Sequence, residues 1–131
     1  MRDMTETPVD TPTLLQTLNS RRDEAFNTQQ PTVLAALYDD EATVMPAGAA
    51  PASGGRAILE FWRNLLAQGV IDHKIEIAET IVDGNLGIQH GTWSAAAVDA
   101  SGQRQTFRGN LQLVFRRQID GSWKTYTHIW N

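Results

Sequence analysis

The stretch TFRGNLQLVFRRQIDGSWKTYTHIW, residues 106–130, is typical of a long β-hairpin. Apolar and polar residues alternate through Leu111, Leu113 and Phe115, and this period of two puts the three side chains on one face of a strand. Asp120-Gly121 then interrupts the pattern with a favoured hairpin-turn sequence. The stretch therefore predicts two antiparallel strands that bury one face.

Two further runs upstream have the same alternating character. They are separated by Asp83-Gly84-Asn85, and Ser101-Gly102 leads from the second run into the hairpin. Strands joined by short turns of this kind pair with their neighbours as an antiparallel meander. We expect strands over residues 73–82, 86–98, 106–119 and 123–130.

The first half of the chain has helical periodicity instead. Thr11-Pro12 is a hydroxyl cap followed by proline, a favoured helix start, and apolar residues follow at helical spacing as far as Phe26. A second helix is expected from Pro31, with Leu37 and Tyr38 on its apolar face. The acidic run Asp39-Asp40-Glu41 is interpreted as the solvated end of that helix, without a chemical role.

A short strand over residues 42–45 follows, stopped by Pro46. Residues 47–55 are rich in Gly, Ala and Pro and are expected to be a loop. A third helix carries Phe61 and Trp62, and Gly69 suits its C-terminal end. Three helices and then four strands predict an α+β fold, with the helices packed on one face of a strongly curved antiparallel sheet.

Length and composition fit one domain. The chain has 131 residues, which we divide into a flexible tail over residues 1–12 and a single domain over residues 13–131. A net charge of −4 argues against nucleic acid or an anionic membrane as a partner, and the absence of Cys excludes disulfides and thiolate chemistry. The N-terminal residues contain no apolar run, so we expect no signal peptide, no membrane span and a cytoplasmic location.

Several short motifs, in this order, resemble the NTF2-like superfamily, and more narrowly its SnoaL-like or DUF4440-type proteins. They are LYDDEATV at residues 37–44, SGGRAI at 53–58, FW at 61–62, GTW at 91–93, LVFRR at 113–117, DGSWK at 120–124 and HIWN at 128–131. The resemblance covers about residues 14–131. It implies a cone-shaped fold with a cavity between the concave sheet and the helices, and a homodimer formed through the outer face of the sheet.

The resemblance also implies which side chains line or floor that cavity. The expected set is Tyr38, Met45, Phe61, Trp62, Gly91, Trp93, Leu111, Leu113, Phe115, Tyr126, His128 and Trp130. Strand alternation agrees where it can be applied: Tyr126, His128 and Trp130 share one face of the last strand. In residues 86–98 alternation allows either face, and the size of Trp93 favours its pointing inward.

Ketosteroid isomerases, which share the fold, need a carboxylate base, a Tyr and a protonated Asp. The corresponding positions here hold Met45-Pro46, Leu113 and a residue near Arg22 or Asp23, so that mechanism is not expected. His128 is the best candidate for proton transfer, because imidazole titrates near neutral pH. Tyr126 could donate a hydrogen bond to it. The opposing interpretation is that both are polar tips satisfied within an apolar wall.

His73 and His90 are expected to be solvated or at an interface, and we predict neither a metal site nor a cofactor. Two functions stay open at this level. The first is a pocket that binds an apolar or aromatic small molecule, with or without isomerase, cyclase, dehydratase or hydrolase activity. The second is an association module in which the dimer surface is functional and the cavity is incidental.

Overall fold

Four long strands form the body of a sheet in the computed structural model, which describes residues 10–131. They are β3 (Val70–Asp83), β4 (Leu86–Val98), β5 (Arg104–Arg117) and β6 (Trp123–Trp130), each antiparallel to the next. Gly84 and Gly121 take the left-handed backbone conformation in two of the connecting turns. The predicted meander is confirmed.

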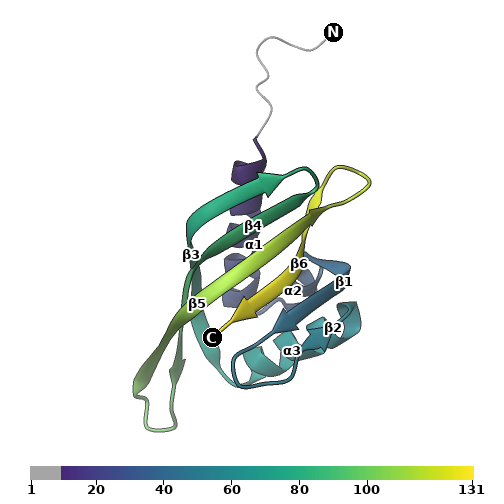
Figure 1. Cartoon of the computed structure of the whole chain (residues 1–131). Coiled ribbons are helices and arrows are strands. Elements are labelled where there is room, and N and C mark those ends of the chain that lie inside the picture. Colours follow the sequence, from purple (N-terminus) through teal and green to yellow (C-terminus); the bar gives the residue numbers. More distant parts are fainter. Residues whose placement is uncertain (1–9) are drawn as a thin grey trace.

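Two shorter strands complete the sheet. β1 (Tyr38–Met45) runs parallel to β6, and β2 (Ala52–Ser53) pairs with β1 at the edge, giving the order β2-β1-β6-β5-β4-β3. The sheet is therefore mixed, and the expected loop over residues 47–55 contains a two-residue strand. β3 bends along its length (Figure 1), with register shifts at two points in its pairing with β4.

Three helices lie on one side of this sheet (Figure 1). They are α1 (Thr11–Asn27), α2 (Pro31–Ala35) and α3 (Gly55–Ala67). The α+β prediction is confirmed. The cap of α1 was predicted wrongly: Asp10 rather than Thr11 caps the helix, its carboxylate accepting from the Thr13 amide at 2.8 Å. Residues 1–9 of the expected flexible tail lie outside the described residues, and its last two residues, Thr11 and Pro12, belong to α1.

The second helix is shorter than predicted. It ends at Ala35, and Tyr38 and the acidic run belong to β1 instead. Asp39 is buried, and Arg116 donates two hydrogen bonds to its carboxylate, at 2.7 and 3.0 Å. This pairing holds the pKa of Asp39 at about 2. The prediction of a helix over residues 37 and 38 was wrong because apolar residues at these two positions fit the start of a strand equally well.

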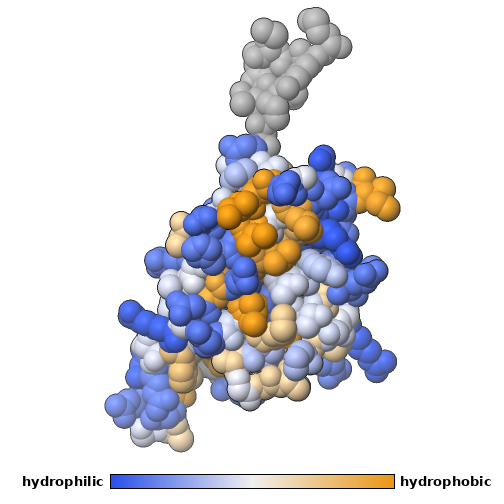
Figure 2. Space-filling model, in the orientation of Figure 1, coloured by the Kyte–Doolittle hydropathy of each residue, from blue (hydrophilic) through white to orange (hydrophobic). Residues whose placement is uncertain are grey.

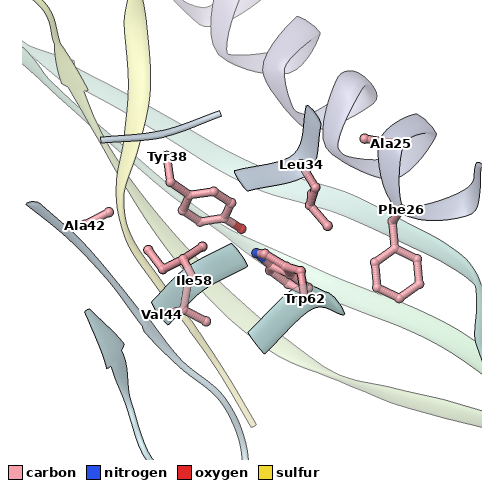
Figure 3. Close-up of a cluster of buried hydrophobic side chains, with 8 residues drawn as sticks. All are labelled: Ala25, Phe26, Leu34, Tyr38, Ala42, Val44, Ile58 and Trp62. Carbon is pink, nitrogen blue, oxygen red and sulfur yellow. The ribbon is translucent and has the colours of Figure 1, made fainter. Parts of the chain in front are cut away.

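Two clusters of apolar side chains form the core. One lies between the helices and β1; Figure 3 shows Tyr38 and Trp62 converging in it, together with Ala25, Phe26, Leu34, Ala42, Val44 and Ile58. The other packs Leu15 of α1 against Leu111, Leu113, Phe115, Ile75 and Trp123. The inward face predicted for β5 is confirmed.

A bulge in β6 changes which of its side chains face inward. The pairing with β5 shifts between Val114↔Thr127 and Phe115↔Thr125, so Tyr126 is the extra residue. Thr125 is therefore buried, and Tyr126 lies on the outer side, where the Arg116 guanidinium sits 4.3 Å from its ring centroid. The prediction that Tyr126 shares a face with His128 is wrong, because strict alternation does not survive a bulge.

The outer face of the sheet carries an apolar row. Ile81, Ile88, Val114 and Thr127 lie opposite one another across β3, β4, β5 and β6. Ile81 is 50% exposed and Ile88 36%. Figure 2 shows hydrophobic atoms gathered over the strands on this face. Within residues 10–131, no helix is long and apolar enough to cross a membrane.

Candidate functional site

A cavity of about 360 Å³ lies between the sheet and the helices. Its wall is mainly aromatic, from Phe26, Phe61, Trp62, Trp93, Phe107 and Trp130, with smaller apolar contributions from Pro46, Ala47, Ala49, Leu65, Val70 and Ala95. The polar side chains that line it are Gln68, His73 and His128. Among the described residues, no Asp, Glu, Lys or Arg lines the cavity. This is the size range and make-up of a small-molecule site.

The residues that the sequence predicts to line the cavity divide into those that line it, those buried in the core and those placed elsewhere in the sheet. Phe61, Trp62, Trp93, His128 and Trp130 line the cavity. Tyr38, Leu111, Leu113 and Phe115 are buried in the core and do not reach it.

Met45 and Tyr126 were placed on the wrong face. Met45 pairs with Ile129, which is 40% exposed on the outer side of β6, although its neighbour Pro46 does line the cavity. Gly91 lies opposite Ile77 and leaves no room for a side chain: a Cβ there would sit 2.0 Å from the Glu76 carbonyl oxygen. These residues shape the sheet and do not line the cavity.

His73 lines the cavity and is held by α1, against the prediction that it is solvated or at an interface. Its Nδ1 lies 2.7 Å from Oδ1 of Asp23, and its ring lies tilted against Phe26, with the ring centroids 4.7 Å apart. One turn further along α1, Asn27 bonds both the amide and the carbonyl of His73, at 2.7 and 2.9 Å. Asp72, just before His73, has a positive φ of 55° where the β3–β4 register shifts. This local distortion lets one residue present its backbone and its ring to the same helix.

The Asp23 carboxylate fixes the state of the His73 ring. Its second oxygen, Oδ2, accepts from the Ile75 amide at 3.1 Å. A carboxylate accepts hydrogen bonds, so Nδ1 of His73 carries the proton and donates it to Asp23. The Nε2 atom of a neutral His73 then has a free lone pair. Nε2 has no hydrogen-bond partner within residues 10–131, and it is not among the atoms sealed from solvent.

His128 is held from the other side of the cavity. Its Nδ1 lies 2.8 Å from the Tyr38 hydroxyl, and both side chains are buried. The Tyr38 hydroxyl has no other hydrogen-bond acceptor among the described residues, so the arrangement that uses its proton has Tyr38 donating to Nδ1. His128 therefore carries its own proton on Nε2. That atom also has no hydrogen-bond partner in the described part of the chain, and it is not sealed from solvent.

The surroundings keep His128 neutral. Burial lowers its pKa well below the usual value, and the positive charge of Arg22 lowers it further. Burial likewise raises the pKa of Tyr38, an effect that the charge of Arg22 partly offsets. At neutral pH the pair is thus an uncharged phenol donating to an uncharged imidazole. When His73 is neutral, the two histidines of the cavity have opposite characters, one presenting a lone pair and the other an N–H.

A polar network lies behind His128. Arg22, completely buried, donates to Asn19 and to the hydroxyl of Thr125. Asn19 donates in turn to Gln89, at 2.7 Å. No pattern in the sequence indicates this burial, because Arg22 lies in a charged run of α1 that suits a solvated face. The pairing of Asp23 with His73 was also missed, since the two residues are fifty positions apart.

The third histidine plays no part in the cavity. His90 is exposed on the opposite face of β4, with Nε2 3.4 Å from Glu79. In the part of the chain that the structure describes, no group of three or more His, Asp or Glu side chains is arranged to hold a metal ion.

Comparison with known proteins places this geometry in a family. A model of the SnoaL-like domain matches residues 21–126. No curated protein matches the chain.

Solved structures share the fold at low sequence identity. A ketosteroid isomerase-like protein from Erwinia carotovora atroseptica superposes with a TM-score of 0.80 at 19% identity, covering 90% of this chain and 92% of that one. An NTF2-like protein with a cystatin-like fold from Novosphingobium aromaticivorans gives 0.77 at 20% identity, with 91% and 79% covered. An NTF2-like superfamily protein from Salmonella enterica gives 0.75 at 17% identity, with 93% and 92% covered.

Identities this low show a common fold and do not show a common activity. The family match spans most of the chain, and the helices, the mixed sheet and their order agree with it. The chain belongs to the SnoaL-like domain family and shares its fold with NTF2-like proteins of known structure.

Proposed function

We propose that this protein binds an apolar or aromatic small molecule in the cavity. His73, as the general base, then removes a proton from that molecule and returns it. The observation that carries the proposal is the 2.7 Å contact between Asp23 and His73 at the cavity wall. A histidine oriented by a carboxylate is the usual arrangement of a base in enzymes that need no cofactor.

His128 supplies the complementary group. Its Nε2–H is a hydrogen-bond donor fixed in direction by Tyr38, and its low pKa keeps it uncharged while it donates. Such a donor holds a ligand oxygen and stabilises negative charge that develops there. Both rings line the same cavity, so one ligand can contact both.

The reaction that suits this pair is removal of a proton next to a carbonyl group. The ligand C–H bond breaks, the proton moves to Nε2 of His73, and the electron pair moves into the carbonyl, whose oxygen is held by His128. Return of the proton to the same or another carbon completes an exchange or an isomerisation. The aromatic wall excludes water and positions a flat ligand.

The test begins with a thermal-shift screen of steroid, polyketide-like and aromatic ketones, because a ligand that prefers the folded state raises the melting temperature. Each ligand found is then incubated with the protein in D₂O, and loss of its α-proton signals is followed by NMR. We expect exchange with the wild type and at least ~100-fold slower exchange with His73→Gln. His90→Gln, on the outer face, is the matched control and should exchange at the wild-type rate.

Two results would remove the proposal. If no compound of the screen stabilises the protein, the cavity does not take this class of ligand. If ligands bind but His73→Gln exchanges their protons as fast as the wild type, His73 is not the base.

We also propose that the partner of this chain is a second copy, docked through the apolar row of Ile81, Ile88 and Val114 on the outer face of the sheet. The exposure of Ile81 and Ile88 supports it. A dimer formed there leaves the cavity free, because the cavity lies on the opposite side of the sheet.

A further inference from the structure

The side chain of Arg22 is completely buried, yet none of the ion pairs within residues 10–131 includes it. Its partners are neutral, namely Asn19 and the Thr125 hydroxyl, and its Nε has no partner. A buried cation is normally paired with a carboxylate, because removing a charge from water is strongly unfavourable. The folded protein therefore holds an uncompensated positive charge in its interior.

The carboxylate nearest in sequence does not compensate it. Both oxygens of Asp23 are engaged on the other side, one by the ring of His73 and one by the Ile75 amide. The described lining of the cavity contains no acidic side chain either. Within residues 10–131, no acidic side chain forms an ion pair that balances the charge of Arg22.

A short path leads from Arg22 to the cavity. The guanidinium carbon lies 5.4 Å from the ring centroid of Tyr38, and the Tyr38 ring stacks on His128 with its hydroxyl bonded to Nδ1. The positive charge reaches His128, whose pKa it lowers. Beside this path Trp62 also has a buried, unpartnered Nε1, and Figure 3 shows that nitrogen turned toward the Tyr38 hydroxyl. Arg22, Tyr38 and Trp62 thus place one cation and two hydrogen-bond donors around His128.

We propose that the cavity takes its ligand as an anion, with a negatively charged oxygen against Nε2–H of His128 and Arg22 as the balancing charge. The ligand class is an apolar or aromatic skeleton that bears a carboxylate or an ionised phenol or enol. Arg22 does not line the cavity, so it is a positioning residue that acts through Tyr38 and His128. This inference rests on the proposed function, since it assumes that the same cavity receives the ligand.

The first experiment uses the wild-type chain and three probes of one shape. Titration calorimetry compares 2-naphthoate with 2-naphthamide, which is neutral, and with 2-naphthylmethylammonium, which is cationic. We expect the carboxylate to bind at least about tenfold more tightly than the amide, and the cation to bind most weakly. A separate titration measures the affinity for 4-nitrophenol at several pH values on either side of its ionisation. An affinity that rises with the ionised fraction would show that the cavity takes an ionised phenol or enol.

The second experiment removes the charge. Arg22→Met should bring the naphthoate-to-naphthamide affinity ratio close to one, while Arg21→Met, one residue away on the exposed side of α1, should leave the ratio at its wild-type value. Tyr38→Phe keeps the charge and breaks the link to His128, and it should lower the ratio to an intermediate value. It also serves as the second test if Arg22→Met does not fold, which circular dichroism will show.

The outcomes separate this inference from the proposed function. Equal binding of the acid and the amide by the wild type, or an unchanged ratio in Arg22→Met, overturns the anion inference and leaves the cavity as a ligand site. Tighter binding of the cation overturns it as well. Absence of binding by every probe counts against the proposed function, and the anion inference falls with it.

Discussion

The Tyr38 hydroxyl lies 2.8 Å from Nδ1 of His128, and the two rings stack with an interplanar angle of 16°. Tyr38 begins β1 and His128 lies in β6, ninety residues later, so the parallel pairing of these strands creates the contact. The contact sets the tautomer of the one buried histidine that faces the cavity. Stability and ligand binding should therefore depend on the same hydroxyl group.

Tyr38→Phe is the direct test of that relationship. The change leaves Nδ1 of His128 buried without a donor, so we expect a loss of about 1–3 kcal/mol in the free energy of unfolding, measured in urea. The chain's other tyrosine provides the control: Tyr126→Phe, on the outer side of the sheet, should change stability by less than about 0.5 kcal/mol. Equal effects of the two changes would contradict the assigned hydrogen bond.

The low pKa of His128 predicts loss of stability in mild acid. The folded state keeps His128 unprotonated, while the unfolded chain binds a proton below the usual pKa of 6.5, so the folded state is stabilised relative to the unfolded state above about pH 6.5 and less so as pH falls below it. The slope from this group is at most about 1.4 kcal/mol per pH unit. Urea titrations between about pH 7 and pH 5 should show a smaller decline for His128→Gln. His90→Gln should keep the wild-type decline; if His128→Gln keeps it too, the assignment is wrong.

The Asp39–Arg116 pair predicts that Asp39→Asn is less stable than the wild type at neutral pH, and that this difference disappears in acid. The pKa of Asp39 falls from 3.8 to about 2 on folding, so its contribution is present above about pH 3.8 and is lost as pH falls through about 2. Asp39→Asn should cost about 1–2 kcal/mol at neutral pH, discounted because Arg116 is partly exposed. Chemical denaturation at several pH values measures it, and Asp40→Asn, its exposed neighbour, should have little effect at any pH. A difference that persists unchanged in strong acid would point to packing instead of charge.

Gly91 of β4 lies opposite β3 at a point with no room for a side chain. A Cβ at this position would lie 2.0 Å from the carbonyl oxygen of Glu76, a backbone atom that cannot rotate away. Gly91→Ala should therefore reduce the free energy of unfolding by at least about 2 kcal/mol, and the melting temperature should fall with it. Gly55→Ala, in the first turn of α3 with nothing within 4 Å of the new atom, should be neutral or slightly stabilising. A tolerated Gly91→Ala would mean that the strands are further apart than described.

The apolar row on the outer face predicts the oligomeric state. Light scattering should give the mass of a dimer for the wild type, and Ile88→Lys should give a monomer because it places a charge in the middle of the buried contact. Ile119 is fully exposed in the β5–β6 turn, away from the row, so Ile119→Lys should remain dimeric. A monomeric wild type, or a dimeric Ile88→Lys, would place the interface elsewhere or exclude it.

The amino-acid sequence alone determined the four strands of the meander, their order and the inward face of β5. It did not indicate β2, or the parallel pairing of β1 with β6 that makes the sheet mixed instead of antiparallel. Alternation through Leu111 and Phe115 and the glycine turns are local features, and local features decide strand limits and hairpin pairing. The motifs around residues 37–44 and 113–124 indicated the family for the same reason, since they encode the packing of neighbouring elements. Trp93 and Trp130 were predicted to line the cavity, and they do.

The tertiary structure decided which polar groups meet. A one-residue bulge moved Tyr126 to the outer face and Thr125 inward, and no pattern in the sequence marks that bulge. Asp23 reaches His73 only because α1 packs across the bent start of β3, and Arg22 is buried by the same packing. Contacts between residues fifty to a hundred positions apart depend on how helix and sheet dock, and short-range periodicity contains no information about docking.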